Sequence, residues 1–151
     1  MATLREKYIR DGRAPIPKKP ITSRIMSLIR AKHTKPEMLL RESLRKIGLS
    51  KFRLHNKKLP GRPDISFVAK KIAIFVNGCY WHRCPHCKPS LPKTHKAFWR
   101  EKFNNNRKRD RTKSKALMTL GWYPITVWEC RIKRDPLAAA RAILKEIRGK
   151  K

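Results

Sequence analysis

The chain has 151 residues, enough for one domain with a core, and 40 lysines and arginines against 10 aspartates and glutamates give a formal net charge of +30. Repulsion on this scale favours a polyanionic partner, and nucleic acid is the first candidate. No apolar run is long enough for a membrane span, and the first residues lack a signal peptide's apolar stretch, so we expect a cytoplasmic protein with no membrane partner. Its reducing environment favours metal binding or catalysis over disulfides for the four cysteines.

The N-terminal part of the chain is basic and rich in proline. Residues 1–22 carry few apolar anchors, which predicts a flexible basic arm, and residues 23–151 are expected to form a single domain. A short basic helix is predicted from Ser23. Thr34 and Glu37 have the spacing of a capping box at the start of a longer helix. The apolar stripe of that helix consists of Met38, Leu39, Leu40, Leu44 and Ile47, and Gly48 can end it.

Three strands are expected after this helix. The segment "KFRLHN" predicts an edge strand, and the turn "LPGRP" leads into "DISFV", a short alternating strand that begins at Asp64. The segment "KIAIFV" is nearly continuously apolar, which is typical of a buried central strand.

The rest of the chain predicts a helix, a strand and a helix. Residues 98–121 are charged and close with Gly121, which indicates a second long helix. The segment "WYPITVW" predicts another buried strand, followed by Cys130, and residues 135–150 predict a C-terminal helix. The order of helix, three strands, helix, strand and helix predicts an α/β sandwich with a mixed sheet.

The four cysteines fall in two places. Cys84 and Cys87 form a C-x-x-C pair on a predicted loop shortly after Cys79, whereas Cys130 follows a distant strand. If that strand lies beside "KIAIFV", the strand ends bring all four thiolates together, which suits a closed, structural Zn²⁺ site. His82 and His86 are possible substitute ligands. The alternatives are a thioredoxin-like dithiol and independent buried thiols.

A phosphodiester-cleaving enzyme usually needs a carboxylate for Mg²⁺ and a base for water. Asp64 is placed for the first role, although it can equally be a turn residue at the end of a strand. No acidic residue lies between Asp64 and Glu101, so the common nuclease pattern of P-D followed by D/E-x-K is broken.

His82 is the candidate base, because histidine titrates near neutral pH. Asp110 is a candidate to orient it, although an acid among arginines more often pairs with them on a solvated face. Glu37 can likewise be no more than the capping-box partner of Thr34. The residues alone leave these alternatives open.

Aromatic side chains occur on two basic stretches. Tyr80 and Trp81 follow the third strand, and Phe98 and Trp99 begin the second long helix. Core packing is the ordinary role of such residues. Aromatics on basic loops can instead wedge between base pairs, at a cost that is lowest at a mismatch.

Together these motifs resemble the very-short-patch repair endonucleases. The resemblance runs from about residue 23 to 131 and rests on "TKPEMLLRESL", "LPGRPDI", "IFVNGCYWHRC", "FWREKFNNNRKRD" and "GWYPITVWEC", in the family's order. It implies a restriction-endonuclease-like three-layer sandwich with a central mixed sheet and a zinc-stabilised loop. It also implies Mg²⁺-dependent nicking of one strand of duplex DNA beside a T·G mismatch, by a monomer with possible repair-protein partners.

The resemblance also implies roles for individual residues. Asp64 would bind Mg²⁺ with the carbonyl of Val76, His82 would be the general base oriented by Asp110, and Glu37 would support the site. Three aromatics would insert beside the mismatch, namely Tyr80, Trp81 and Trp99. Four cysteines would bind zinc, namely Cys79, Cys84, Cys87 and Cys130.

The chain departs from the family's pattern at two positions. Asn77 stands where many members have a histidine, and Cys84 stands where the zinc set often includes one. His86 has no assigned role. Two alternatives to mismatch nicking remain, namely a defence-type DNA nickase with relaxed substrate choice and a non-catalytic zinc module that binds DNA by charge alone.

Overall fold

The computed structural model describes residues 32–150, so the predicted basic arm and the predicted helix from Ser23 lie outside the described part. The described elements, in chain order, are α2 (Lys35–Lys46), β1 (Arg53–Leu54), β2 (Ile65–Phe67), the 3₁₀ turn η1 (Val68–Lys70), β3 (Ile72–Asn77), α3 (Cys79–His82), α4 (Lys96–Thr119), β4 (Tyr123–Trp128), α5 (Glu129–Arg134) and α6 (Pro136–Gly149). The predicted order of long helices and strands is confirmed. Sequence patterns missed the short helices α3 and α5.

The four strands form one mixed sheet in the order β1-β2-β3-β4. Strands β1, β2 and β3 pair antiparallel, whereas β3 and β4 pair parallel, with Ile72 opposite Tyr123 and Asn77 opposite Trp128. The predicted mixed sheet, edge strand β1 and central strand β3 are therefore confirmed. Because β3 and β4 end in register, the segments that follow them leave the sheet at the same edge.

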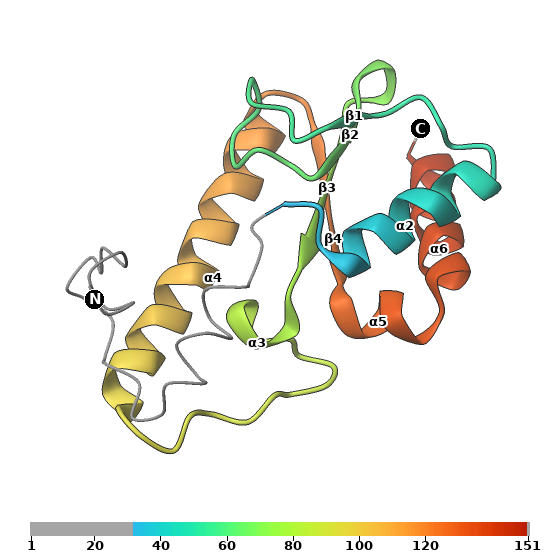
Figure 1. Cartoon of the computed structure of the whole chain (residues 1–151). Helices are drawn as coiled ribbons and strands as arrows, with labels where there is room; N and C mark the ends of the chain where they lie inside the picture. The colour runs from blue at the N-terminus through green and yellow to red at the C-terminus, as the bar shows by residue number, and fades with distance from the viewer. Residues whose placement is uncertain (1–31, 151) are drawn as a thin grey trace, which may run out of the picture.

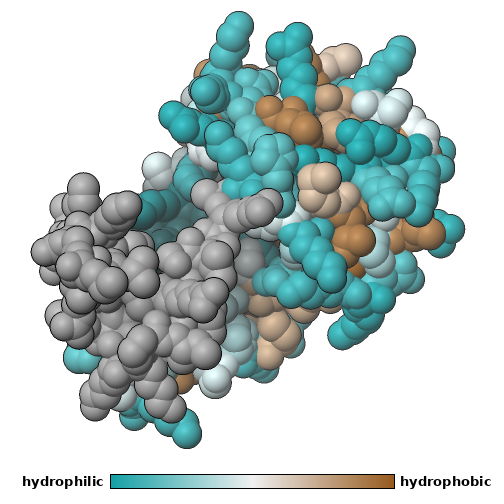
Figure 2. All heavy atoms as spheres, viewed as in Figure 1, coloured by the Kyte–Doolittle hydropathy of each residue, from teal (hydrophilic) through white to brown (hydrophobic). Residues whose placement is uncertain are grey.

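Helices cover both faces of the sheet. Figure 1 shows α4 along one side of the strands, and α2, α5 and α6 grouped on the other. No helix within residues 32–150 is long and apolar enough to cross a membrane. The face shown in Figure 2 is mainly hydrophilic where the structure is described, with hydrophobic areas in small separate patches.

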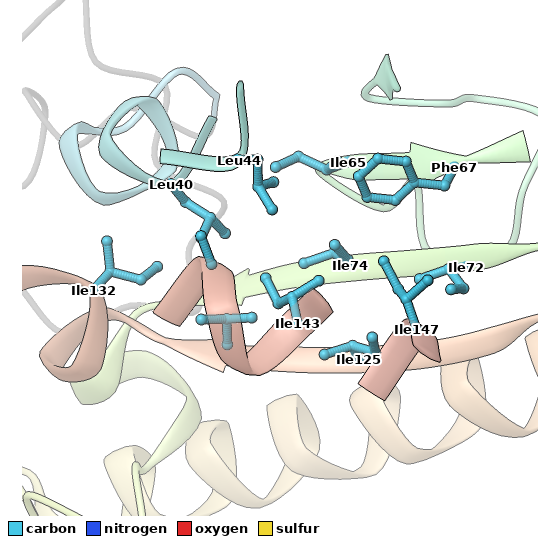
Figure 3. Packing of buried hydrophobic residues seen from close by; sticks show 12 residues of the cluster. Leu40, Leu44, Ile65, Phe67, Ile72, Ile74, Ile125, Ile132, Ile143 and Ile147 are labelled. Carbon is cyan, nitrogen blue, oxygen red and sulfur yellow. The ribbon is translucent and has the colours of Figure 1, made fainter. Parts of the chain in front are cut away.

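The hydrophobic core lies between the sheet and α2, α5 and α6 (Figure 3). Leu40 and Leu44 of α2 are fully buried there, against strand residues that project from one sheet face at every second position. Those strand residues are Ile65, Phe67, Ile72, Ile74, Ile125 and Val127. Burial of this stripe fixes the strand register, since a slip of one residue would turn every apolar side chain to the other face.

Three burial predictions need correction. Met38 is 49% exposed, because it lies two positions before Leu40 and so on the opposite side of α2. All three residues of β2 are buried instead of alternating; the polar one, Ser66, is fully buried with its hydroxyl 3.5 Å from the side-chain amide of Asn56. Strand β4 is an edge strand whose outward residues, such as Thr126, are exposed, instead of a fully buried strand.

The turn before β2 packs closely on α4. Gly61 has a positive φ of 76°, and a Cβ placed on it would lie 2.6 Å from the Cδ atom of Lys113. A side chain at this position would strain the backbone and displace either the turn or the side chain of Lys113. The contact therefore fixes where the chain enters β2, and with it the position of Asp64.

We expect Leu40→Ala to lower the free energy of unfolding by about 2–5 kcal/mol, because it opens a cavity in the core. Leu120→Ala is the matched control: Leu120 is 55% exposed, and its removal should change stability by no more than about 0.5 kcal/mol. Chemical denaturation of both variants measures the difference. Equal losses would contradict the position of the core.

Candidate active site and cysteine cluster

Asp64 lies at the start of β2 with its side chain against β3. Its Oδ2 atom accepts a hydrogen bond of 2.7 Å from the backbone N–H of Val76, and its side chain is 21% exposed. Burial raises the pKa of Asp64 above its ordinary value, while the Val76 N–H, Arg41 and His82 act in the opposite direction. In an antiparallel pair one residue directs its N–H and C=O to the same neighbouring strand. The Val76 carbonyl therefore faces the side on which Asp64 lies.

His82 and Asp110 come from different helices and meet beside the end of β3. The Nδ1 atom of His82, the last residue of α3, lies 2.6 Å from Oδ2 of Asp110 in the middle of α4. Their side chains are 27% and 28% exposed. Asp110 thus contacts the histidine, and forms no ion pair with the neighbouring arginines in the described part of the chain. With Nδ1 donating to the carboxylate, Nε2 is the nitrogen left to accept a proton.

Glu37 lies in a buried polar network and not in a capping box. The side chain of Thr34 makes no capping hydrogen bond, and Glu37 is 1% exposed. The carboxylate of Glu37 instead accepts a hydrogen bond from Arg41 and lies 2.9 Å from Nε2 of His55. The capping-box prediction is wrong because burial directs Glu37 towards a guanidinium one helical turn away.

The same network reaches Asp64. The Nδ1 atom of His55 lies 3.9 Å from Oδ1 of Asp64, and the backbone N–H of His55 donates to the carbonyl oxygen of Asp64. Burial, followed by the positive charge of Arg41, lowers the pKa of His55. Sequence reasoning missed Arg41 and His55. The only local signal was the spacing of four residues between Glu37 and Arg41, which is typical of a helical ion pair.

The four cysteines converge, as the predicted strand pairing required. Cys79 begins α3 after β3, and Cys130 lies in α5 after β4, so the parallel strands bring them together. The four sulfur atoms lie within 4.8 Å of one another. Burial raises the pKa of Cys79, so the unpaired thiolate is costly there and a cation would stabilise it.

The geometry of the cluster suits a tetrahedral metal ion. The Sγ atoms of Cys84 and Cys130 lie 3.7 Å apart, and Zn–S bonds of about 2.3 Å place tetrahedral ligands about 3.8 Å apart. That separation is too long for a disulfide. The two histidines that the sequence offers as substitute ligands lie elsewhere: His82 contacts Asp110, and His86 is exposed, with its ring 3.5 Å from Arg131.

Aromatic side chains gather between α3 and the start of α4. Tyr80 lies 5.1 Å from Trp81 and 6.5 Å from Trp99, measured between ring centroids. All three are half-buried, and Lys102 lies over both tryptophan rings. Asn106 donates a hydrogen bond to the carbonyl oxygen of Trp81, which ties α3 to α4. The structure therefore places the predicted aromatics in one partly exposed cluster with a cation.

Two hollows lie near these groups. Asn77 and Asp110 line a small one between β3 and α4. A larger hollow of about 800 Å³ lies between β4 and α6, and neither Asp64 nor His82 lines it. The larger hollow is therefore not the candidate active site.

Known proteins with similar sequences point to one class. Residues 16–88 match the family described as DNA mismatch endonuclease Vsr. The type II nicking enzyme V.XorIIP of Xanthomonas oryzae pv. oryzae is 41% identical, over 82% of this chain and 88% of its own. The type II nicking enzyme V.NaeI of Lentzea aerocolonigenes is 37% identical, over 91% and 85%. The DNA mismatch endonuclease Vsr of Escherichia coli is 37% identical, over 80% and 76%.

The chain has an α/β fold and clustered acids and histidines, and its relatives are nucleases that act on DNA. Together these features define it as a DNA endonuclease. The identity extends over most of the chain and most of each relative. The chain belongs to the Vsr family, the very-short-patch repair endonucleases, and the family resemblance of its motifs is confirmed.

We expect Glu37→Ala to lower the free energy of unfolding by about 3–5 kcal/mol, because it leaves the buried Arg41 charge unpaired. Glu42→Ala is the matched control on the same helix, since its pair with Lys46 is exposed and should contribute little. Thermal melting compares the two variants. Similar melting temperatures would contradict a buried ion pair at Glu37.

Proposed function

We propose that the protein nicks one strand of duplex DNA beside a T·G mismatch by Mg²⁺-dependent hydrolysis, as in very-short-patch repair. The observation that carries the proposal is the contact of 2.6 Å between His82 and Asp110, together with the carboxylate of Asp64, which is hydrogen-bonded to the strand β3 that leads into the helix of His82. The names of the relatives support it, since one is a mismatch endonuclease and others are nicking enzymes.

The residues at Asp64 suit a hard divalent cation. A carboxylate held by a backbone N–H, with a main-chain carbonyl on the same side, offers the oxygen ligands that Mg²⁺ prefers. The carboxylate of Asp64 and the main-chain carbonyl of Val76 would hold the ion. When bound, Mg²⁺ supplies positive charge that polarises the phosphodiester and stabilises the charge that develops on it.

His82 and Asp110 would activate the attacking water. His82 Nε2 takes a proton from water as the water oxygen bonds to phosphorus and one P–O ester bond breaks; the leaving oxygen keeps the bonding electron pair and takes up a proton from solvent water. Asp110 orients the imidazole and stabilises its protonated form, because its carboxylate already lies against Nδ1. Asn77 lines the hollow beside Asp110 and has no acid–base chemistry, so His82 acts without a second histidine there.

The cysteine cluster would hold a structural Zn²⁺ that fixes the catalytic histidine. Four thiolates leave no open position for a substrate, which is typical of a structural site. Cys79 and His82 are the first and last residues of α3. Zinc would therefore set the position of the helix that carries the base.

The aromatic cluster and the basic surface would select and hold the DNA. Tyr80, Trp81 and Trp99 would unstack the base step beside the mismatch, where pairing is weakest. The charge of +30 favours duplex DNA and opposes self-association, so we propose a monomer on DNA, with repair proteins as possible partners. We further propose that residues 23–151 form one restriction-endonuclease-like three-layer domain, the arrangement that this family implies.

A nickase with relaxed substrate choice is the second candidate. It is favoured by the name of V.XorIIP and of several other relatives, which are called type II nicking enzymes. The chemistry at Asp64 and His82 would be the same. The two candidates differ only in how strongly the mismatch controls the rate.

We expect Asp64→Ala and His82→Ala each to reduce Mg²⁺-dependent nicking of a T·G duplex by at least about 100-fold, because each removes a group that acts on the reacting atoms. Binding of the duplex should persist. Nicking is followed on a labelled duplex, and binding by a gel shift. Glu146→Ala is a control for the loss of one acidic charge, because Glu146 is exposed on α6. Undiminished nicking by either variant would remove that residue from the mechanism.

We expect purified protein to contain about one equivalent of zinc, because the four thiolates form a closed set. Cys84→Ser should lose zinc and melt at a lower temperature. His86→Ala should retain the metal, since its ring lies outside the cluster. Elemental analysis together with thermal melting tests this. A protein with four reactive thiols and little zinc would contradict the proposed metal site.

A further inference from the structure

Arg41 is a buried cation between metal-ligand side chains. Its side chain is 3% exposed. One terminal nitrogen donates to Glu37 and lies 3.0 Å from Nε2 of His55, and the other lies 3.0 Å from Nδ1 of His33. Its Nε atom has no hydrogen-bond partner in the described part of the chain, so the two terminal nitrogens alone hold the guanidinium.

The three residues around Arg41 are ligands of the kind that bind transition metals. His33, Glu37 and His55 each offer one ligand atom, and these atoms lie within 4.8 Å of one another. Two histidines and a carboxylate are a common set for zinc and for other divalent metals. Here Nδ1 of His33, a carboxylate oxygen of Glu37 and Nε2 of His55 lie against the guanidinium of Arg41.

We propose that Arg41 is a built-in cation that fills a metal-type site formed by His33, Glu37 and His55, beside the Mg²⁺ site at Asp64. Its part in catalysis rests on the proposed function, whereas its place among these ligands does not. Arg41 is thus a positioning residue: it satisfies Glu37 and directs His55 towards Asp64.

The hydrogen bonds show how the positioning works. The Nε2 atom of His55 lies 3.0 Å from a terminal nitrogen of Arg41 and 2.9 Å from the carboxylate of Glu37, so this ion pair holds one side of the imidazole ring. The Nδ1 atom of the same ring faces Oδ1 of Asp64 at 3.9 Å, while Oδ2 is held by Val76. Arg41, together with Glu37, therefore fixes the ring of the histidine that lies against the other oxygen of Asp64.

Unlike a bound metal ion, an arginine side chain cannot leave the site. The guanidinium remains charged at all relevant pH values and stays attached to α2. Glu37 is then satisfied without a divalent ion, and only the Asp64 side of the site depends on Mg²⁺. Removal of Arg41 should leave three ligands without a cation and turn the site into a true metal site.

The metal-binding test uses full-length protein with zinc at the cysteines, and Co²⁺ as the probe in equilibrium dialysis. Wild type should retain no added Co²⁺ at this site, whereas Arg41→Gln should retain about one equivalent. Arg41→Gln with His33→Ala should bind it at least about tenfold more weakly, because one ligand is missing. Arg41→Lys keeps the charge and should retain none.

Two results would overturn the proposal. One is Co²⁺ bound by wild type and lost on His33→Ala, which would show that the ligands already accept a metal beside Arg41. The other is an Arg41→Gln variant that melts cooperatively yet binds no added ion. Arg41→Met is a second neutral variant if the glutamine variant does not fold, and the wild-type result decides the matter if neither folds.

The catalytic test uses the T·G duplex in Mg²⁺. Arg41→Gln should nick at least about tenfold more slowly, because its supporting cation is lost. Added Co²⁺ should restore nicking in this variant and leave wild type unchanged. His33→Ala should prevent the rescue, which a merely structural role of Arg41 would not explain. A slowed variant that Co²⁺ does not rescue would contradict the positioning role. If wild type itself does not nick, the proposed function fails, while the Co²⁺ binding test still stands.

Discussion

The parallel pairing of β3 and β4 is the constraint on which the rest of the site depends. Both strands end at the same edge of the sheet, with Asn77 opposite Trp128. The chain therefore enters α3 and α5 side by side, which brings Cys79 to Cys130. Since α3 also carries His82, one strand register positions both the thiolate cluster and the histidine that meets Asp110.

The second constraint on the site is the burial of two acidic side chains in a strongly basic protein. A chain with a net charge of +30 has few acids, and the structure buries Glu37 and largely buries Asp64. Each buried carboxylate is held by a specific donor, Arg41 for Glu37 and the Val76 backbone for Asp64. Such pairing is required because an uncompensated buried charge is costly. Each of the two buried carboxylates thus has its own partner within the fold.

The sequence predicted the elements whose signals are local. The stripe of Leu40 and Leu44, the apolar run of β3 and the glycine after α4 identify their elements directly. The meeting of Cys79 and Cys130 followed from one assumed strand pair. The network at Arg41 could not be predicted from the sequence. His55 and Asp64 are distant from Arg41 along the chain, and only the tertiary fold brings them to it. The exposure of β4 was missed because strand order is not readable from a strand's own residues. The family motifs supplied the remaining site residues, whose roles stay predictions.

In the proposed function, this site nicks one strand and mismatched pairing controls where it does so. The most direct measurement compares wild-type nicking with Mg²⁺ on duplexes of one sequence that carry T·G, another mismatch or full pairing, with the cut mapped on both strands. The account predicts a single cut in one strand, beside the T·G mismatch, and much slower cutting of the other duplexes. Equal rates on all duplexes, cuts in both strands or no Mg²⁺-dependent cut would contradict it.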